Sequence, residues 1–420
     1  MTTSQTLLRR ILSFLGRLLA FLLSLLFCLP LILLPLATAV PAVLWIVLAA
    51  LAVALLFVQF RLKPAWKGVA ASLAGLVVVA VMAVIASQAF ATTPPIVDAQ
   101  GEPLPGSIAV LEQVEINGSQ QWISIRGQDA SKPVLLFLAG GPGGSQLATA
   151  RYALGGLEEH FVVINWEQPG AGKSFDAVDR ATLTSERYIE DAHALVQYLR
   201  QRFGQDKVYV LGESWGSALG ILLVQSYPEL FHAFVGTGQM VAFLENDQMC
   251  YDFAVQWAQE RGDTAKVAKL AGQGPPPYYG DGVAWKESAF LMDTFDYMNQ
   301  NPAIADNGAN TFRDLAAPEY GLYDKVSWFR GVLETLGIVY PQLWEVDFRQ
   351  QATELDVPVY FLLGRHDVNA PTVLAEQYFT LLDAPHKEIV WFEHSGHTPW
   401  VSESDRFVEA MVDTVLAQTQ

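Results

Sequence analysis

The hydrophobic positions of the first ninety residues are continuous rather than periodic. Residues 18–60 contain 43 positions without a charged side chain. A single helix of that length would run about 65 Å, roughly twice the hydrocarbon core of a bilayer, so the run must fold back on itself. Its least hydrophobic stretch is Ala37-Thr38-Ala39, close to three prolines. We therefore predict membrane spans over 18–38 and 41–60, and a third over 68–90.

The alternative for this run is a cleaved signal peptide, whose apolar region is only about 7–15 residues long. The greater length found here favours true spans. Basic residues precede the first span and separate the second from the third, at Arg9, Arg10, Arg17, Arg61, Lys63 and Lys67. Three crossings put both basic groups on one side, which the positive-inside bias makes the cytoplasm. The sequence thus predicts a multi-pass protein of the cell membrane, with everything after residue 90 on the extracytoplasmic side.

After residue 90 the pattern changes to short apolar runs separated by helical periodicity. Residues 91–106 carry four prolines and no periodicity, and we expect them to be a linker. The next runs are typical of strands, and the middle ones are continuous, as in strands buried on both faces. They cover Ile108–Ile116, Gln121–Arg126, Val134–Leu138, Phe161–Trp166, Val208–Leu211, Phe234–Gly236, Val357–Leu363 and Ile389–Phe392. Helical patterns between them, notably Ser185–Phe203 and Trp215–Tyr227, predict an α/β fold with a mostly parallel sheet flanked by helices.

The stretch 240–345 breaks this alternation, because it is rich in aromatic residues and methionine and has a mostly helical pattern. We predict an inserted helical lid, although aromatic side chains in an ordinary helical core would give the same pattern. The predicted organisation is a membrane anchor over 1–90, a linker over 91–106, a core formed by 107–239 and 346–420, and a lid over 240–345.

Composition narrows the classes of function. From residue 98 onward the chain holds 20 basic and 43 acidic residues. Such an acidic surface repels a phosphate backbone, so we expect no nucleic-acid partner. Two cysteines, Cys28 and Cys250, provide neither a disulfide framework nor a four-thiolate metal site. An exported domain without disulfides fits a bacterial envelope, and no metal or organic cofactor is expected.

The clearest chemical signal is Gly212-Glu213-Ser214-Trp215-Gly216, which follows an apolar strand and opens a helix. A serine hydroxyl is a poor nucleophile unless its oxygen is exposed and a base takes its proton. A tight strand-to-helix turn exposes the oxygen, and the flanking glycines allow that turn. The five-residue pattern also occurs in ordinary exposed turns. Its place between strand and helix predicts that Ser214 is a catalytic nucleophile.

A second motif, Ala139-Gly-Gly-Pro-Gly143, follows another continuous apolar strand. Its backbone amides can point toward a developing oxyanion because no bulky side chains intervene. In a serine hydrolase of this type one donor is the residue after the nucleophile, Trp215, and the other comes from this loop, where we choose Gly141. A plain glycine turn is the alternative. The loop 168–174 resembles a phosphate loop, but Glu167 stands where that loop requires glycine, so nucleotide binding is not expected.

The acid and the base of the predicted triad are Asp367 and His397. Each follows a predicted strand directly, so both lie at the sheet edge that carries Ser214. Their order along the chain, serine then aspartate then histidine, is that of strand-turn-helix serine hydrolases. His397 would take the serine proton, and Asp367 would hold the imidazole in the required tautomer. His394 and His366 are competing bases, each with less loop in which to reach the serine.

These motifs, in this order, resemble those of the α/β-hydrolase family and, within it, the proline iminopeptidase (prolyl aminopeptidase) group. That group carries His-Gly-Gly-Pro-Gly in the oxyanion loop, Asp-Gln-Arg-Gly-x-Gly-x-Ser after the next strand and Gly-Gly-Ser-Trp-Gly-Ser at the nucleophile. This chain has Ala139-Gly-Gly-Pro-Gly143, Glu167-Gln-Pro-Gly-Ala-Gly-Lys-Ser174 and Gly212-Glu-Ser-Trp-Gly-Ser217. The resemblance covers about residues 105–420 and implies the α/β-hydrolase fold and the triad, but it does not extend to the membrane spans.

Four positions depart from the group's pattern: Ala139 replaces a histidine, Glu167 an aspartate, Pro169 an arginine and Glu213 a glycine. The core mechanism needs none of the four. The group is also similar to esterases and other small-molecule hydrolases, so the resemblance alone does not choose between peptide and ester substrates.

The resemblance also implies a site for the substrate's free amino terminus, which lid carboxylates hold in that group. Glu245 is the best-placed match, with Asp252 or Glu287 as a second acid. A solvated acid at the start of a helix is the alternative reading of Glu245.

The sequence therefore predicts a membrane-anchored serine hydrolase that releases an N-terminal residue, proline among the candidates, from short peptides through an acyl-enzyme. The alternative is a carboxylesterase or thioesterase that acts on lipid-like acyl substrates at the membrane surface. A catalytically inactive binding module is the third possibility, and the complete Ser-Asp-His set argues against it. The expected partners are a small-molecule or short-peptide substrate and the lipid bilayer.

Overall fold

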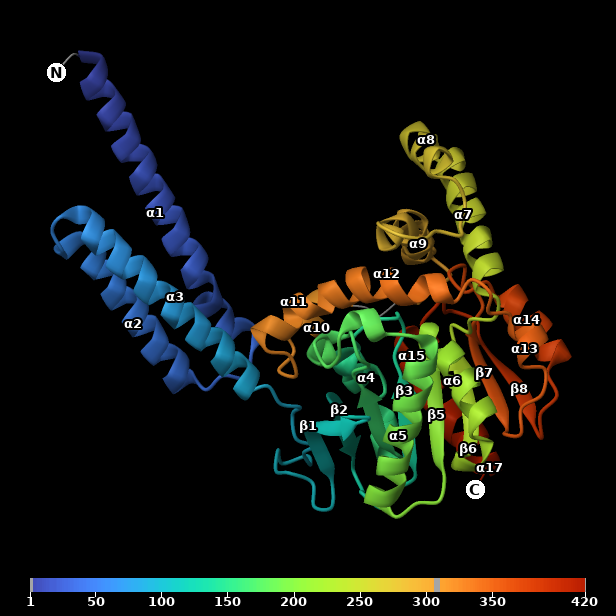
Figure 1. Cartoon of the computed structure of the whole chain (residues 1–420). Coiled ribbons are helices and arrows are strands. Elements are labelled where there is room, and N and C mark those ends of the chain that lie inside the picture. Colours follow the sequence, from blue (N-terminus) through green and yellow to red (C-terminus); the bar gives the residue numbers. More distant parts are fainter. Residues whose placement is uncertain (1–2, 306–309, 420) are drawn as a thin grey trace. The chain divides into compact units, whose positions relative to one another are not determined.

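The computed structural model describes residues 3–305 and 310–419 and consists of two compact units. One unit contains the chain up to Thr92 together with Leu315–Lys325. The other contains Thr93–Asp314 and the chain from Val326 onward. Figure 1 shows the elements of both units in sequence colours.

Within the described residues, the first unit contains three helices that are long and apolar enough to cross a membrane. They are α1 (Thr3–Ala37), α2 (Ala42–Arg61) and α3 (Ala65–Ala89). The chain turns between α1 and α2 where the least hydrophobic stretch predicts it. Helix α1 begins well before the predicted residue 18, because leucine and arginine are good helix formers whether or not they lie in hydrocarbon. Hydrophobicity alone therefore marks the span but not the start of the helix.

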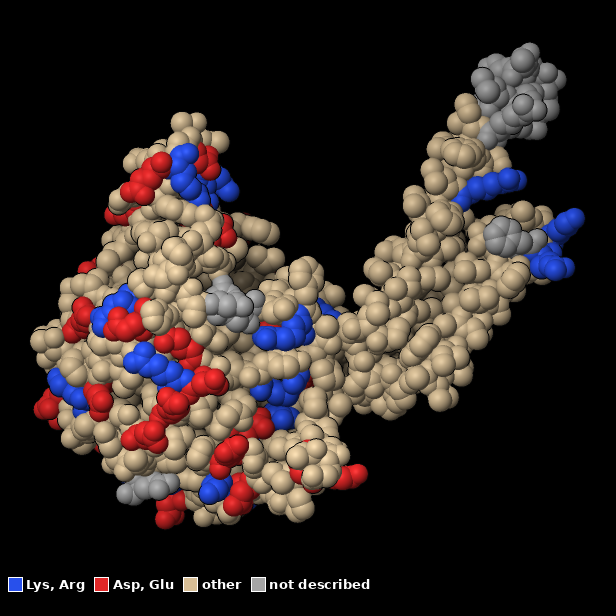
Figure 2. Space-filling view, turned by 180° about the vertical axis from the view of Figure 1, so that it is seen from behind, with Lys and Arg blue, Asp and Glu red and all other residues tan. Residues whose placement is uncertain are grey.

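The three helices pack through a small apolar core and leave most of their apolar side chains on the outside. Leu34, Leu76 and Ala83 are fully buried in this core, whereas Leu22, Val47 and Ile85 are more than half exposed. Figure 2 shows basic side chains near one end of these helices, and residues 1–92 contain no acidic residue. The start of α1 and the α2–α3 turn share that end because consecutive helices run in opposite directions. This is the arrangement that three crossings require.

A short piece of the segment between strands β6 (Phe231–Thr237) and β7 (Val359–Gly364), residues Leu315–Lys325, belongs to this helical unit. Leu322 packs in its apolar core, and the backbone amide of Leu322 donates a hydrogen bond of 2.8 Å to Ser87 Oγ at the end of α3. Gln88 Nε2 donates to Asp324 Oδ1 at 2.7 Å, and Gln88 Oε1 accepts from the amide of Tyr323 at 3.3 Å. The end of α3 therefore supplies hydrogen-bond partners to the start of helix α11 (Leu322–Arg330).

Gln88→Ala is expected to destabilise the full-length protein by about 1–3 kcal/mol, because it removes the two hydrogen bonds of the Gln88 side chain to α11 and leaves their partners to be resolvated. Thermal unfolding in detergent micelles measures the change. Gln100→Ala, at an exposed position, is the control and should leave the transition unchanged. Equal transitions for the two variants would show that this contact does not stabilise the fold.

In the second unit, the described strands form one eight-stranded sheet in the order β1-β2-β4-β3-β5-β6-β7-β8. The pairs from β4 through β3 to β8 are parallel, and β1–β2 and β2–β4 are antiparallel. The sequence prediction of a mostly parallel sheet is confirmed. The strands are β1 (Ile108–Ile116), β2 (Ser119–Gly127), β3 (Val134–Leu138), β4 (Val162–Trp166), β5 (Val208–Glu213), β6 (Phe231–Thr237), β7 (Val359–Gly364) and β8 (Lys387–Phe392).

Helices cover both faces of the sheet (Figure 1). One face packs on α5, α6 and α14 and the other on α4, α16 and the C-terminal turns, with an apolar core on each side. The helices of this unit outside the segment 240–345 are α4 (Leu147–Ala153), α5 (Ser185–Phe203), α6 (Trp215–Ser226), α13 (Phe348–Gln351), α14 (Thr372–Leu381), α15 (Pro399–Ser402), α16 (Ser404–Glu409) and α17 (Ala417–Thr419). Every residue of β3 and β5 is buried, which is why these strands have continuous apolar sequences.

Between β6 and β7 the described chain is mainly helical. Its α-helices within residues 240–345 are α7 (Phe243–Glu260), α8 (Thr264–Gln273), α9 (Val283–Gln300), α10 (Thr311–Ala316), α11 (Leu322–Arg330) and α12 (Leu336–Val339), and α13 follows them. Helices α7, α8 and α9 share a core of their own that includes Cys250, Leu270 and Phe290. We call residues 240–345 the helical insertion.

Segment 93–106 is more ordered than its proline content predicts. Arg126 Nη1 donates to Thr93 Oγ1 at 2.8 Å and to the Pro94 carbonyl at 2.6 Å. Val97 and Pro103 form an antiparallel bridge. The buried Arg126 of β2 thus holds the start of this segment. The sequence pattern of residues 91–106 does not predict this contact, because its partner lies in a strand more than 30 residues away.

Candidate active site

Ser214 lies at the turn between β5 and α6, with a backbone φ of +54°. A non-glycine residue in this region is strained, and such strain is typical of functional turns. The turn is held by Ser217, whose Oγ donates to the Ser214 carbonyl at 2.6 Å and accepts from the Met240 amide at 3.0 Å. Gly216 must be glycine, because a Cβ there would collide with the Leu138 carbonyl at the end of β3. The result is a half-buried Ser214 side chain at the carboxyl edge of the sheet.

The glycine loop after β3 lies against this turn, and both Gly141 and Trp215 line the same pocket as Ser214. Neither backbone amide donates a hydrogen bond to another described residue. Two such amides beside a nucleophile are what an oxyanion hole requires.

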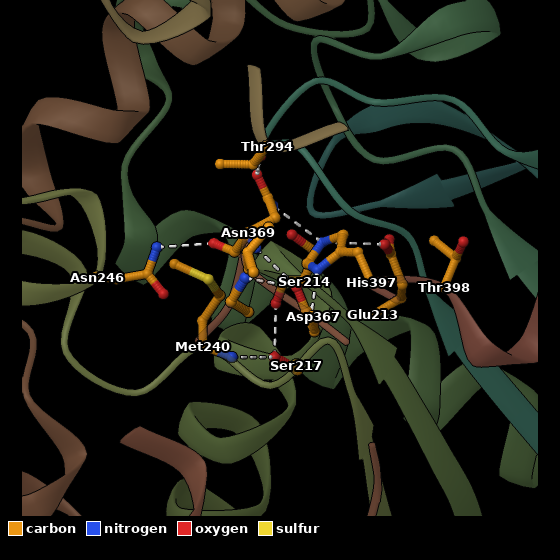
Figure 3. Close-up of polar contacts among 12 residues, drawn as sticks. Glu213, Ser214, Ser217, Met240, Asn246, Thr294, Asp367, Asn369, His397 and Thr398 are labelled. Atoms are coloured by element: carbon orange, nitrogen blue, oxygen red, sulfur yellow. Dashed lines mark hydrogen bonds and ion pairs between the residues drawn. The ribbon is translucent and has the colours of Figure 1, made fainter. Parts of the chain in front are cut away.

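His397 and Asp367 lie on the loops that follow β8 and β7. His397 Nδ1 and Asp367 Oδ2 are 2.9 Å apart, and both side chains are buried. Asp367 Oδ1 accepts from the backbone amides of Asn369 and Ala370 at 2.8 and 2.9 Å. These donors fix the carboxylate and hence the ring that it orients, as Figure 3 shows.

The other nitrogen of the ring, Nε2, faces Asn369 and Glu213. Asn369 Nδ2 lies 3.3 Å from it, and because Asn369 Oδ1 accepts from Thr294 Oγ1, the amide nitrogen is the group turned toward the ring. Glu213 Oε1 lies 3.6 Å from Nε2. No hydrogen bond between Ser214 Oγ and His397 is present among the described residues; such bonds often tighten only when substrate binds.

Burial lowers the pKa of His397, but the charge and hydrogen bond of Asp367, with a smaller contribution from Glu213, outweigh it and raise that pKa to about 8. A histidine must be neutral to accept a proton, so a base of this kind works best in mildly alkaline solution.

A cavity of about 410 Å³ opens between the sheet edge and the helical insertion. Ser214, Trp215, Gly141 and His397 line one part of it. Most of the other lining residues are apolar, among them Phe243, Leu291, Phe295, Trp328 and Leu336. Its size is that of a pocket for a small molecule or for one end of a peptide.

Besides Glu213, one acidic side chain lines this cavity, Glu287 on α9. It is fully buried, and neither of its carboxylate oxygens has a hydrogen-bond donor among the described residues. It interacts with Asp247 on α7, which accepts from Tyr340 Oη and Asn246 Nδ2 at 3.0 Å each. Burial raises the pKa of both carboxyls, and the charge of Asp247 raises that of Glu287 further. The pair therefore holds one proton and one negative charge around neutral pH.

Residues 133–399 match the pattern that defines the α/β-hydrolase fold family. The chain belongs to the α/β-hydrolase family. This assignment confirms the fold class expected from the sequence and makes the chain a hydrolase.

Relatives of this hydrolase are aminopeptidases by name. The probable aminopeptidase YbaC of Bacillus subtilis is 29% identical over 314 residues, which are 73% of this chain and 96% of that protein. The proline iminopeptidase of Lactobacillus delbrueckii subsp. lactis is 23% identical over 311 residues, covering 71% and 95%. The crystal structure of a Mycobacterium smegmatis proline iminopeptidase has the same fold, with a TM-score of 0.52, 17% identity and coverage of 74% and 98%.

The structure of the hydrolase brings together five of the six site residues expected from the sequence: Gly141, Ser214, Trp215, Asp367 and His397. The two competing histidines lie elsewhere. His394 is exposed with Nδ1 3.3 Å from the Ala303 carbonyl, and His366 Nε2 lies 3.1 Å from the Glu393 carbonyl.

Glu245, the sixth, does not lie in the pocket. Its side chain is 46% exposed and forms an ion pair with Arg349. Asp252 is also exposed. The buried face of α7 carries Phe243, Asp247, Cys250 and Ala254 instead, and that spacing of three and four residues is a helical face that the sequence already contains. Helical phase was thus the signal that distinguishes Asp247 from Glu245.

Proposed function

We propose that this hydrolase is a membrane-anchored serine aminopeptidase with Ser214, His397 and Asp367 as its triad. The observation that carries the proposal is Glu287, a buried carboxylate without donors in the pocket that Ser214 lines. Burying a charge is costly unless it is paired, so such a group is suited to a cationic ligand. The ammonium group of a free amino terminus supplies the positive charge and the N–H donors that Glu287 lacks. Asp247 lies behind it, and the pair shares one proton.

In the acylation step, His397 Nε2 takes the proton of Ser214 while Oγ attacks the carbonyl carbon of the N-terminal residue. Asp367 keeps the proton of Nδ1 and stabilises the imidazolium. The amides of Gly141 and Trp215 donate to the oxyanion. His397 then gives its proton to the leaving amine, and the acyl-enzyme forms. Water, activated by the same histidine, releases the N-terminal residue.

Binding of the free amino terminus in the same cavity as the nucleophile would limit the cut to the first residue. The α-amino group is separated from the scissile carbonyl by a single carbon, so a substrate held by its ammonium at Glu287 presents its first carbonyl to Ser214. The apolar wall of the cavity, with Phe243, Leu291 and Phe295, favours an uncharged first residue. Proline is the candidate that the relatives' names suggest.

The proposal assigns residues 1–90 to the anchor, 107–239 and 346–420 to the catalytic core and 240–345 to a lid. Its support is the length and composition of α1, α2 and α3 and the distribution of basic residues around them. The catalytic core then lies on the extracytoplasmic side of a bacterial cell membrane.

Full-length protein in detergent micelles should hydrolyse proline p-nitroanilide and cleave its N-acetylated form roughly 10³-fold more slowly. The blocked substrate has no charge for Glu287 and leaves that group unpaired. Comparable rates on the two anilides would contradict an aminopeptidase.

Turnover of p-nitrophenyl butyrate without turnover of either anilide would favour the second candidate, an esterase or thioesterase for lipid-like acyl substrates. The apolar wall of the cavity is the observation that favours it. In that case the wall would accommodate an acyl chain.

A further inference from the structure

Glu213, the residue before Ser214, has a buried carboxylate that the mechanism above does not use. Its Oε1 lies 3.6 Å from His397 Nε2, and both side chains are only 4% exposed. Figure 3 shows Glu213 and Asp367 in contact with different nitrogens of the same ring. The proline iminopeptidase motif that this chain resembles has glycine at this position. The glutamate that replaces it here places a second carboxylate beside His397.

The oxyanion loop holds this carboxylate in place. Gln146 Nε2 donates to Glu213 Oε2 at 3.2 Å, and Gln146 Oε1 accepts from the amide of Gly140 at 3.3 Å. A Cβ at Gly140 would collide with Glu213 Oε2, so the carboxylate occupies the space that the glycine leaves open. With one oxygen fixed by Gln146, the other is directed at the imidazole.

We infer that Glu213 is a positioning residue of the catalytic base: it holds His397 from the Nε2 side and stabilises the imidazolium that forms when Ser214 loses its proton. The inference rests on the proposed function, because it takes His397 as the base of a serine hydrolase. The proton passes from Ser214 Oγ to His397 Nε2 and then to the leaving group. Glu213 contributes charge and takes no proton.

The charge of Glu213 is favoured most when His397 is protonated. Burial raises the pKa of Glu213, and the charge of His397, the side chain of Gln146 and the amide of Gly140 oppose that rise. Glu213 is therefore most firmly charged when His397 carries a proton, the state that follows proton transfer. An interaction that strengthens along the reaction lowers the barrier, whereas one of constant strength does not.

Few other groups around the ring can titrate. In the described chain the groups that face His397, besides Glu213, are Asp367 and Asn369 after β7, Phe295 on α9 and Gly238 after β6. Of these only Asp367 is ionisable. Loss of the Glu213 charge should therefore lower the pKa of His397 from about 8, with Asp367 as the remaining carboxylate.

The test is the rate at which a fluorophosphonate labels Ser214, measured against pH on the full-length protein in detergent micelles. The serine oxygen displaces fluoride when His397 takes its proton, so the rate follows the fraction of neutral His397 and needs no knowledge of the natural substrate. The wild-type rate should be half-maximal near pH 8. In Glu213→Gln, which keeps the shape and removes the charge, the midpoint should fall by roughly one pH unit.

Glu213→Gly introduces the residue found in the proline iminopeptidase motif and should shift the midpoint in the same direction. Agreement of the two variants would show that the shift comes from loss of the Glu213 charge and not from the new glutamine. Glu393→Gln is the matched control, since Glu393 lies in the same loop as His397 but is exposed and paired with Arg365. It should keep the wild-type midpoint. Unchanged midpoints in both folded Glu213 variants would overturn the inference and leave the triad intact. A wild-type protein that takes no label would overturn the proposed function, and this inference with it.

Discussion

Ser214→Ala is expected to lower kcat/KM by roughly 10⁴-fold or more on every substrate that the enzyme hydrolyses. The variant removes the atom that attacks the carbonyl and leaves the oxyanion amides and the pocket in place, so residual activity would come from binding and from the oxyanion hole. Hydrolysis of proline p-nitroanilide and of p-nitrophenyl butyrate, with full-length protein in micelles, measures the loss. Labelling by a fluorophosphonate should disappear in parallel.

Ser226→Ala is the matched control for this substitution. Ser226 ends the helix that Ser214 begins, and among the described residues its hydroxyl donates to the Leu222 carbonyl alone, at 2.8 Å, so its loss should leave hydrolysis and labelling unchanged. Activity of Ser214→Ala equal to that of the wild type would remove the serine from the mechanism and with it the assignment of a triad.

Glu287→Gln is expected to lower kcat/KM for proline p-nitroanilide by roughly 10²-fold or more, because the substrate ammonium would then lose the carboxylate of the pair that lines the cavity. Hydrolysis of p-nitrophenyl butyrate should change little, since that ester has no amine. The ratio of the two rates isolates amine recognition from catalysis. Asp247→Asn should act in the same direction, because it removes the carboxyl with which Glu287 shares a proton.

Glu245→Gln distinguishes the amine ligand that the family resemblance implies from Glu287, which lines the cavity. The family resemblance favours Glu245 as the amine ligand, but its exposed ion pair with Arg349 predicts less than about a twofold effect, as for other surface pairs. A large loss in Glu245→Gln with none in Glu287→Gln would restore the motif-based assignment. Equal loss of anilide and ester hydrolysis in Glu287→Gln would instead identify Glu287 as a structural residue.

The parts of the fold that local patterns predict are those in which one physical requirement dominates. Strand β3 and helix α5 have the predicted bounds, Val134–Leu138 and Ser185–Phe203. A strand buried on both faces needs a continuous apolar run, and a surface helix needs an apolar stripe between a cap and a C-terminal glycine. Helix α5 has both ends, with Thr184 as the N-cap and Gly204 in the left-handed conformation. Strand β6 begins three residues earlier than predicted, because the sheet pairs Phe231 with Val208.

The chain order and the strand ends were enough to predict that Ser214, Asp367 and His397 lie together, since residues at the carboxyl ends of parallel strands meet at one edge. The side-chain contacts around that edge could not be predicted from the sequence, because they join residues from different segments. The amide nitrogen of Asn369 faces His397 because Thr294 donates a hydrogen bond to the amide oxygen of Asn369. Glu213 reaches the same ring because Gln146 fixes its other oxygen.

The sequence by itself determined the apolar spans, the mostly parallel sheet and the order of the catalytic motifs, because each depends on the residues of one segment and on its exposure to lipid, core or solvent. Only the tertiary structure decided which acid enters the pocket. Glu245 and Asp247 lie on one helix two residues apart, and the packing of α7 against α9 and Tyr340 turns Asp247 inward beside Glu287 and leaves Glu245 with Arg349. Such pairings join residues that are distant in sequence, and their energies arise only when the helices have packed.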